Sequence, residues 1–222
     1  MAKYPHLCVP IQETTQKKAI QALQALKGKA DVAEIWLDHI RDLDVQALIK
    51  ASPLPVLAVC KKPIEQGRFK GTYAEQAEVL SQAAKAGAQY VDLPLKSPQL
   101  TTYNFQPSIL IVSYHNFKST PSNTELLKKI KTMRRRGADI VKIAVTPKSM
   151  ADTFRIIQLA HQFKEQKIPH ILIAMGKLGV LSRVLTPLTG GTLMFAPLNK
   201  GKNTAPGQLT IKELREAWEI FS

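Results

Sequence analysis

The chain has 222 residues, of which 45% are hydrophobic and 22% charged, so it is long enough to bury one large core. No apolar stretch approaches the length that crosses a bilayer, which excludes a membrane-spanning helix. The formal net charge of +14 favours an anionic partner, whether nucleic acid, anionic lipid or a small carboxylate, without choosing among them.

The first residues have no apolar signal-peptide region before the first expected strand. Cys8 and Cys60 lie inside apolar runs and do not have the spacing of metal ligands. Both are typical of small core residues in a reducing compartment, so we expect a cytoplasmic protein.

Eight short apolar runs predict strands, separated mostly by segments with helical spacing. The strands are expected at residues 6–11, 31–37, 55–60, 88–95, 108–114, 138–145, 169–175 and 191–197. The helices are expected at residues 14–26, 72–86, 122–136, 149–167 and 211–221. Two connections are weaker as helices, because 43–51 is short and 95–106 contains Pro98, whereas 179–188 is partly helical.

Capping residues mark several helix ends. Thr72 with Glu75, and Ser122 with Glu125, have the capping-box pattern of a helix start. A glycine closes three of the helical runs just before a strand, at positions 28, 87 and 137. The repeated unit is therefore a helix, a glycine and a short strand.

Alternating strands and helices predict a parallel sheet, and eight strands in a chain of this length favour a closed (β/α)8 TIM barrel. We expect residues 1–222 to form one such domain, since no linker or low-complexity tract interrupts them. The first strand is not followed by a Gly-x-Gly-x-x-Gly sequence, which counts against a dinucleotide fold. Active sites of TIM barrels lie where the strands end and the following loops begin.

Lys142 lies in the middle of the sixth expected strand, Ala138-Asp139-Ile140-Val141-Lys142-Ile143-Ala144-Val145. Strand alternation places it on the same face as Ile140 and Ala144, which we expect to point into the barrel. An ammonium group in apolar surroundings loses hydration, which favours the neutral amine, the nucleophile of Schiff-base chemistry. The alternative interpretation is a structural lysine that pairs with a buried carboxylate or reaches solvent at the strand end.

Candidate site residues, most of them charged or polar, recur at the expected strand ends. They are Glu34 on the second strand, Lys61 and Glu65 after the third, His115 after the fifth, Met175 ending the seventh, Arg183 beyond it, and residues 204–208 after the eighth. Together with Lys142 they predict a carbonyl site for an anionic substrate.

The densest basic cluster lies on the expected helix 122–136 and is interpreted as its solvated face. Its members are Lys128, Lys129, Lys131, Arg134, Arg135 and Arg136. No aromatic residues interleave with these charges in the manner of a nucleic-acid platform, so we expect no nucleic-acid partner.

Four motifs together resemble type I 3-dehydroquinate dehydratases, the Schiff-base lyases of the shikimate pathway of aromatic amino acid biosynthesis. They are Val112-Ser113-Tyr114-His115-Asn116-Phe117, the strand around Lys142, Gly179-Val180-Leu181-Ser182-Arg183 and Thr204-Ala205-Pro206-Gly207-Gln208. They occur in the family's order and cover nearly the whole chain. The loop at 61–67 is more similar to the dehydratase halves of bifunctional dehydratase–shikimate dehydrogenases.

The resemblance implies a hydro-lyase that acts on 3-dehydroquinate without a metal or organic cofactor. Lys142 would form an imine with the C3 ketone, and His115 would remove a proton from C2 and assist departure of the C1 hydroxyl. Glu65 would hold and polarise His115, and such a carboxylate is expected to raise the pKa of His115.

The resemblance also implies a set of substrate contacts. Arg183 would bind the substrate carboxylate and Glu34 the hydroxyls, while Gln208 comes from a loop that closes over the site. Met175, Phe117 and Phe195 match apolar walls. Lys61 stands where many members have arginine, and Thr204 where serine is common.

One position departs from the family, which usually has arginine where this chain has Trp36. Arg68 is a candidate to supply the missing cation. Two alternatives follow from the residues: a Schiff-base lyase or aldolase acting on a sugar phosphate, with Gly190-Gly191 as the only hint of a phosphate cradle, or a non-catalytic basic barrel that binds a ligand. The sequence is compatible with a homodimer.

Overall fold

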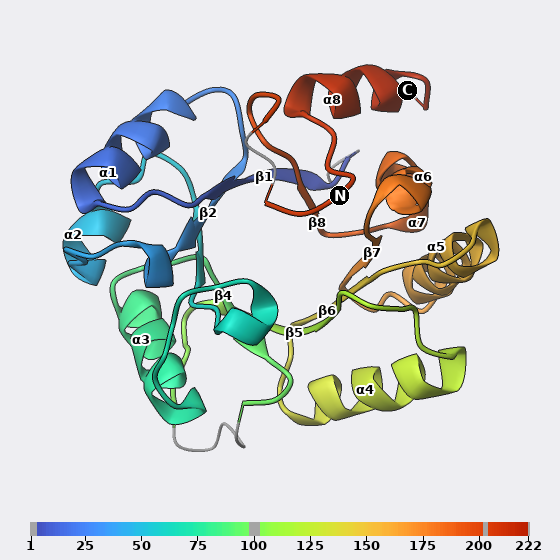
Figure 1. Cartoon of the computed structure of the whole chain (residues 1–222), viewed down its shortest axis with the longest axis horizontal. Helices are drawn as coiled ribbons and strands as arrows, with labels where there is room; N and C mark the ends of the chain where they lie inside the picture. The colour runs from blue at the N-terminus through green and yellow to red at the C-terminus, as the bar shows by residue number, and fades with distance from the viewer. Residues whose placement is uncertain (1–3, 98–102, 202–203, 222) are drawn as a thin grey trace.

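The computed structural model of the chain describes residues 4–97, 103–201 and 204–221, and its centre is a sheet of eight strands (Figure 1). The strands are β1 (His6–Ile11), β2 (Val32–Trp36), β3 (Val56–Val59), β4 (Tyr90–Pro94), β5 (Ile109–Asn116), β6 (Ile140–Val145), β7 (His170–Ala174) and β8 (Leu193–Phe195). Each predicted strand is present, with edges that differ by a few residues.

The sheet order is β7-β6-β5-β4-β3-β2-β1-β8, and each neighbouring pair runs parallel. No ladder pairs β7 with β8 among the described residues; instead the Thr192 N–H donates to the His170 carbonyl oxygen at 2.9 Å. The sheet is therefore a nearly closed barrel, and the predicted (β/α)8 TIM-barrel fold is confirmed.

The helices surround this barrel on the outside (Figure 1). They are α1 (Gln16–Ala25), α2 (Val45–Lys50), α3 (Tyr73–Lys85), α4 (Asn123–Arg135), α5 (Met150–Glu165), α6 (Val180–Val184), α7 (Thr186–Thr189) and α8 (Ile211–Glu219), with short 3-10 turns η1 (Leu37–His39), η2 (Pro63–Glu65) and η4 (Lys177–Gly179). In the described ranges, no helix has both the length and the apolar character needed to cross a membrane.

Both predicted capping boxes are present, and Thr210 with Glu213 forms a third at the start of α8. The weak segment 43–51 does form a short helix, α2, because the Asp44 side chain accepts from the Ala47 N–H at its first turn. The segment 95–106 has no helix in its described part.

Burial follows the strand pattern. All residues of β2, β3, β4, β6, β7 and β8 are buried, as expected for parallel strands covered by helices outside and by side chains within the barrel. Strand β5 extends to Asn116, so His115 lies on the strand opposite Ala144 of β6, rather than after the strand as its sequence predicted. This register places His115 at the same barrel end as Lys142.

Candidate active site

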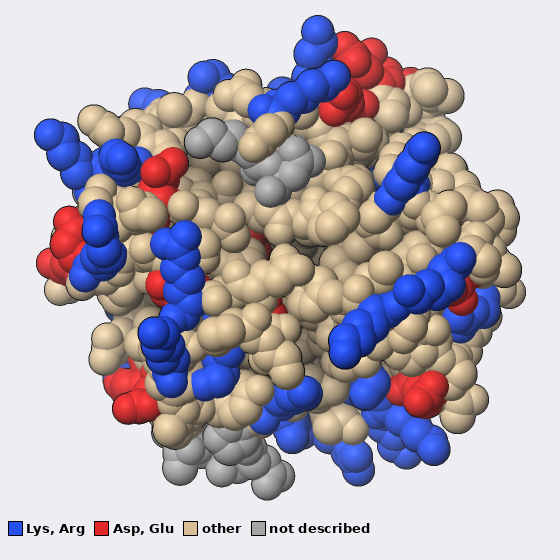
Figure 2. Space-filling model, in the orientation of Figure 1, with Lys and Arg blue, Asp and Glu red and all other residues tan. Residues whose placement is uncertain are grey.

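A pocket opens at the carboxyl ends of the barrel strands. Figure 2 shows this end of the molecule, where Lys and Arg side chains project from the surrounding surface. The pocket is lined by Glu34, Trp36, Lys61, Glu65, Gln66, His115, Phe117, Lys142, Ala144, Ile173, Met175, Arg183, Phe195, Thr204, Ala205 and Gln208. All eleven residues proposed from the sequence are among them.

Lys142 projects from β6 into the barrel, as its strand position predicted, and is 5% exposed. Its amine lies 4.2 Å from the centre of the Phe195 ring. It also lies 2.7 Å from Oδ2 of Asp92 and 3.9 Å from Oε1 of Glu34. Two carboxylates therefore flank the amine. The expectation of apolar surroundings is wrong, and the alternative of a lysine paired with a buried carboxylate describes its contacts.

Asp92 is the residue that the sequence prediction missed. It lies on β4, is fully buried, and contacts Lys142 through one oxygen and Lys61 through the other, the latter at 2.6 Å. The Ser113 hydroxyl donates to the oxygen that faces Lys61 at 2.5 Å. Burial raises the pKa of Asp92, but the two ammonium charges outweigh burial and hold it well below its usual range.

Lys61 points inward from the end of β3 and is 3% exposed. Burial lowers its pKa, but the negative charges of Asp92 and Glu65 outweigh burial, so the pKa is raised overall. The backbone N–H of Lys61 donates to Asp38 Oδ1 at 2.9 Å, and the N–H of Arg68 to Asp38 Oδ2 at 2.7 Å. Asp38 thus fixes the loop after β3, whereas the Arg68 side chain is exposed and outside the pocket lining.

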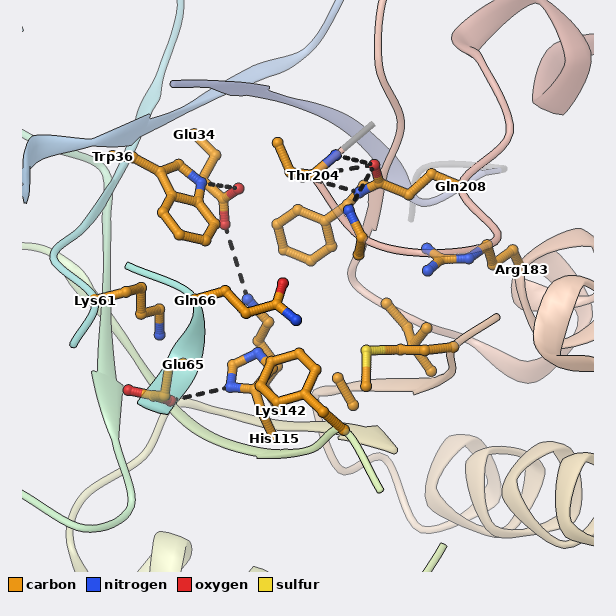
Figure 3. Close-up of a pocket in the computed structure, with 16 residues that line it drawn as sticks. Glu34, Trp36, Lys61, Glu65, Gln66, His115, Lys142, Arg183, Thr204 and Gln208 are labelled. Carbon is orange, nitrogen blue, oxygen red and sulfur yellow. Dashed lines mark hydrogen bonds and ion pairs between the residues drawn. The ribbon is translucent and has the colours of Figure 1, made fainter. Parts of the chain in front are cut away.

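His115 of β5 pairs with Glu65 of η2, in the loop after β3, although β4 lies between β3 and β5. The His115 Nδ1 lies 3.1 Å from Glu65 Oε1 (Figure 3). The Phe117 ring stacks on the imidazole, with 5.9 Å between the ring centres. Gly67 allows the loop carrying Glu65 to fold back, because a Cβ there would lie 2.0 Å from the Lys61 carbonyl oxygen. The predicted contact between Glu65 and His115 is present, between the loop after β3 and strand β5.

The electrostatics of this pair differ from the prediction. Burial lowers the pKa of His115; the hydrogen bond to Glu65 raises it, but the charges of Lys61 and Lys142 lower it further. The expected raised pKa is wrong, and the pKa is lowered overall. Burial raises the pKa of Glu65, but Lys61 and the His115 hydrogen bond outweigh burial and lower it. Glu65 is therefore a stable carboxylate beside a neutral imidazole at neutral pH.

Arg183 is a buried cation without a carboxylate partner in the described part of the chain. It lies on α6, is 1% exposed, and burial alone lowers its pKa to about 10. Its Nη1 contacts Met194 Sδ at 3.8 Å, and its Nε is buried with no hydrogen-bond acceptor among the described residues. A buried guanidinium in this state is suited to an anionic group of a ligand in the pocket.

The loop after β8 brings Thr204 and Gln208 to the pocket mouth. Gln208 Oε1 accepts from the Thr204 backbone N–H at 2.9 Å, which closes a small turn. Gly207 has a φ of +75° and packs against Gly176 of the loop after β7, whose N–H donates to the Pro206 carbonyl at 2.9 Å. Backbone contacts thus hold the two loops together.

Met175, Phe195 and Phe117 are apolar lining residues of the pocket, and Phe117 lies next to His115. Trp36 also lines the pocket, and its indole N–H donates to Glu34 Oε2 at 2.9 Å. Gly191, half of the suggested phosphate cradle, precedes β8 and packs near Thr186 and the His170 carbonyl, where the strands begin. The cradle is therefore at the opposite end of the barrel from the pocket.

A sequence signal for Asp92 was available. Like Lys142, it is a charged residue within an apolar run that predicts a buried strand, Tyr90-Val91-Asp92-Leu93-Pro94. A buried carboxylate needs a charged or hydrogen-bonding partner, and a buried lysine needs the same. Because each of the two residues needs a partner, the sequence could have predicted that Asp92 pairs with Lys142.

Known proteins match this chain over nearly its full length. A family model described as type I 3-dehydroquinase matches residues 7–222. The chain is 34% identical over 215 residues to the 3-dehydroquinate dehydratase of Desulfotalea psychrophila, with 94% of this chain and 95% of that protein covered.

A bifunctional 3-dehydroquinate dehydratase/shikimate dehydrogenase of Arabidopsis thaliana is 35% identical over 235 residues; the match covers 99% of this chain but only 38% of the relative. The crystal structure of the 3-dehydroquinate dehydratase from Geobacillus kaustophilus superposes with a TM-score of 0.88 at 28% identity, covering 98% of this chain and 91% of that one. The family match and the pocket agree, and the chain belongs to the type I 3-dehydroquinase family.

Proposed function

We propose that the protein is a 3-dehydroquinate dehydratase, which removes water from 3-dehydroquinate to give 3-dehydroshikimate through an imine on Lys142. Membership of the type I family supports this reaction. The observation that carries it is the position of the Lys142 amine, inside a pocket that also presents an imidazole and a guanidinium without a carboxylate partner among the described residues. In this function the enzyme serves the shikimate pathway of aromatic amino acid biosynthesis.

Removal of the C2 proton leaves an electron pair on carbon, which the reaction must stabilise. A proton next to a ketone is weakly acidic, and converting the ketone to a protonated imine makes an electron sink at C3. His115, neutral because burial lowers its pKa, would accept the C2 proton and then return it to the departing C1 hydroxyl as water forms. This sequence needs no metal or organic cofactor.

Glu65 would orient the imidazole and stabilise its cation, the part that a carboxylate has in catalytic triads. Its hydrogen bond to Nδ1 leaves Nε2 as the ring nitrogen that accepts the substrate proton. Since Glu65 is held as a carboxylate, it stabilises the imidazolium formed during the reaction.

Substrate binding would use the remaining lining residues. Arg183 would pair with the substrate carboxylate, because its guanidinium has no competing acidic partner among the described residues. Glu34, Lys61, Thr204 and Gln208 would contact polar groups of the substrate, and Met175, Phe117 and Phe195 would enclose its carbon ring.

The test is to incubate the protein with 3-dehydroquinate and follow the ultraviolet absorbance of the conjugated enoate of 3-dehydroshikimate. A Schiff-base enzyme for sugar phosphates would leave this substrate unchanged and would turn over a phosphorylated ketose instead. A non-catalytic barrel would turn over neither. Lys142→Ala protein, assayed beside the wild type, separates catalysis at this site from a contaminant.

We also propose that residues 1–222 work as one barrel domain in the cytoplasm, with a small-molecule substrate and without nucleic-acid or membrane partners. A homodimer is compatible with this proposal. Light scattering of the purified chain at several concentrations tests for the dimer, and nucleic acid added to the assay tests whether the basic surface has a second ligand.

A further inference from the structure

Glu34 and Trp36 form a pair on one side of the Lys142 amine (Figure 3). They lie two residues apart on β2, so both point into the barrel. The Trp36 indole N–H donates to Glu34 Oε2 at 2.9 Å, while Glu34 Oε1 faces Lys142 Nζ at 3.9 Å. The carboxylate is 4% exposed and the indole 8% exposed. The Glu34 carboxylate therefore accepts a hydrogen bond from a neutral indole through one oxygen and faces the amine that would react through the other.

Two carboxylates flank Lys142, and their surroundings differ. Asp92 contacts two ammonium groups and a hydroxyl, which stabilise its charged form. Glu34 has one hydrogen bond from a neutral indole and one more distant ammonium. Pairs of titratable groups whose environments differ in this way divide into a permanent charge and a proton carrier.

The charges that face Glu34 come from several strands. Burial raises its pKa most strongly; Lys142 of β6 and the Trp36 hydrogen bond lower it, Asp92 of β4 raises it and Lys61 after β3 lowers it. Cys8 of the adjacent β1 is a further neighbour, a buried thiol whose own pKa is raised by burial and by Glu34. The pKa of Glu34 is raised overall, in contrast to that of Asp92.

We propose that Glu34 is the acid–base group that makes and hydrolyses the Lys142 imine, and that Trp36 is the residue that positions it. This inference rests on the proposed dehydratase reaction and assigns Glu34 a role in proton transfer beyond contact with substrate hydroxyls. It leaves removal of the C2 proton to His115, whose imidazole pairs with Glu65.

The proton balance closes around Glu34. The carboxylate takes one proton from the Lys142 ammonium, and the resulting amine attacks the substrate ketone, forming the C–N bond. A proton passes from this nitrogen to the former ketone oxygen and gives the carbinolamine. Glu34, now a carboxylic acid, protonates the hydroxyl; the C–O bond breaks, water leaves and the nitrogen lone pair forms the C=N bond. The product is an iminium beside a carboxylate, and hydrolysis reverses these steps.

The indole at position 36 suits this role better than the arginine usual in the family. A guanidinium in contact with Glu34 would stabilise its charged form and oppose protonation. The indole N–H holds one oxygen in place with a neutral hydrogen bond, so orientation is kept without a second positive charge. Tryptophan in place of arginine at position 36 thus leaves Glu34 able to gain and lose a proton.

The first test needs no substrate. The chain has two tryptophans, at positions 36 and 218, so a ¹⁵N-correlated spectrum contains two indole N–H signals, and Trp36→Phe identifies the first. We expect the Trp36 signal to shift as Glu34 titrates, with a midpoint above the value of about 4.3 of a free glutamate. Trp218, which donates to the Arg183 carbonyl, is the internal control.

Glu34→Gln is the matched control for this titration, since its amide oxygen still accepts from Trp36. The His39 ring lies 5.4 Å from the Trp36 ring, so a shift that remains in Glu34→Gln comes from another nearby group such as His39. A Trp36 signal that titrates equally in wild type and Glu34→Gln, or that stays fixed from about pH 3 to pH 8, overturns the inference.

The second test isolates imine formation. Enzyme and 3-dehydroquinate are mixed rapidly and quenched with borohydride at increasing times, and the reduced adduct is measured by mass. We expect imine formation to be roughly 100-fold slower in Glu34→Gln than in wild type, because general acid–base catalysis is lost. An unchanged rate with a raised KM would show that Glu34 only contacts the substrate and would overturn the inference.

Trp36 is tested by two substitutions with opposite expectations. Trp36→Phe removes the donor and should move the pH profile of imine formation to higher pH, whereas Trp36→Arg should move it to lower pH. A residue with a structural role alone would leave the profile in place. If the wild-type protein neither turns over 3-dehydroquinate nor forms an adduct with it, the proposed dehydratase function is contradicted. If the wild type turns over normally and these variants form the imine at the same rate and with the same pH profile, only the present inference is contradicted.

Discussion

The Lys142 amine lies 2.7 Å from Oδ2 of Asp92, and the other oxygen of that carboxylate is already paired with Lys61 at 2.6 Å. The two ammonium groups thus share one buried anion. If Lys142 is removed, Asp92 keeps Lys61 as its partner. If Asp92 is removed, two buried ammonium groups lose their main counter-charge, so the two deletions are not equivalent.

We therefore expect Asp92→Ala to lower the free energy of unfolding by about 3–5 kcal/mol, the usual cost of stranding a buried charge. Lys142→Ala should cost less than half as much and keep the fold. Urea denaturation of both variants at neutral pH measures the difference. Equal losses of unfolding free energy in the two variants would show that Asp92 is not the main counter-charge of the two lysines.

The adduct prediction concerns which lysine reacts. Borohydride reduction in the presence of 3-dehydroquinate should add the mass of the reduced ligand to the peptide containing Lys142. Lys61 lies in the same pocket, but the charges of Asp92 and Glu65 outweigh its burial and raise its pKa, so it should stay protonated and remain unmodified. Peptide mapping by mass spectrometry decides; an adduct on Lys61 or Lys177 would contradict the assignment. Lys142→Ala should show neither adduct nor turnover.

Arg183→Ala should raise KM by roughly 10- to 100-fold, the range expected when a hydrogen bond to a charged group is lost. The loss in kcat should be smaller, since the substrate carboxylate does not react and its ion pair is similar in ground and transition states. Steady-state kinetics separate the two. A defect confined to kcat would mean that the guanidinium acts on developing charge.

Arg183→Met supplies a stability control for the same residue. It removes a buried cation that has no ionic partner in the described part of the chain, and methionine fills much of the space. We expect unfolding free energy to stay level or to rise while KM rises as in Arg183→Ala. A large loss of stability would indicate that Arg183 is held by protein contacts and is not reserved for a ligand.

Glu65→Gln should move the acidic limb of the kcat/KM profile to lower pH. His115 must be neutral to accept a proton, so activity appears as pH rises through its pKa. The Glu65 hydrogen bond and charge raise that pKa, and removing the charge lets burial, Lys61 and Lys142 lower it further. The maximal rate should fall, though less than in His115→Ala, because the imidazolium loses a stabilising charge. A profile and rate both unchanged would mean that His115 works independently of Glu65.

Two glycines of the β8–α8 loop offer a matched comparison. Gly207 and Gly201 both have positive φ, +75° and +81°. A Cβ at Gly207 would lie 2.3 Å from the Gly176 carbonyl oxygen, whereas a Cβ at Gly201 would have no atom of the described residues within 4 Å. Gly207→Ala should therefore displace the turn that carries Thr204 and Gln208 and raise KM. Gly201→Ala, which has only the backbone strain, should keep KM close to wild type.

The sequence predicted the barrel because its signals are local. Capping boxes such as Thr72 with Glu75, and apolar runs of strand length, repeat in an order that leaves few other folds. Lys142 was identifiable because a charge within a buried strand requires an explanation. Asp92 met the same criterion, but the contact between the two residues depends on the fold, which places β4 and β6 on either side of β5.

The electrostatics of His115 show where local reasoning ends. Its partner Glu65 was predicted, and the direction in which that carboxylate acts was correct. The burial of the imidazole and the charges of Lys61 after β3 and Lys142 on β6 arise only in the folded barrel, and together they reverse the net pKa shift of His115. Likewise, a lone arginine in the sequence gives no sign that Arg183 lacks an acidic neighbour, because pairing depends on tertiary packing.

The junction between β7 and β8 has fewer backbone hydrogen bonds than the other strand junctions of the described barrel. All other neighbouring strands are joined by ladders, but here the described backbone contributes one hydrogen bond, from Thr192 to His170. Arg183 follows β7 and its guanidinium touches Met194 of β8, so the side chain reaches across this junction. Local opening should therefore be easiest here, and amide exchange in β8 should be faster than in β5 or β6. An anion bound by Arg183 would stabilise this junction, so ligand binding in the pocket should slow local opening between β7 and β8 and the amide exchange of β8.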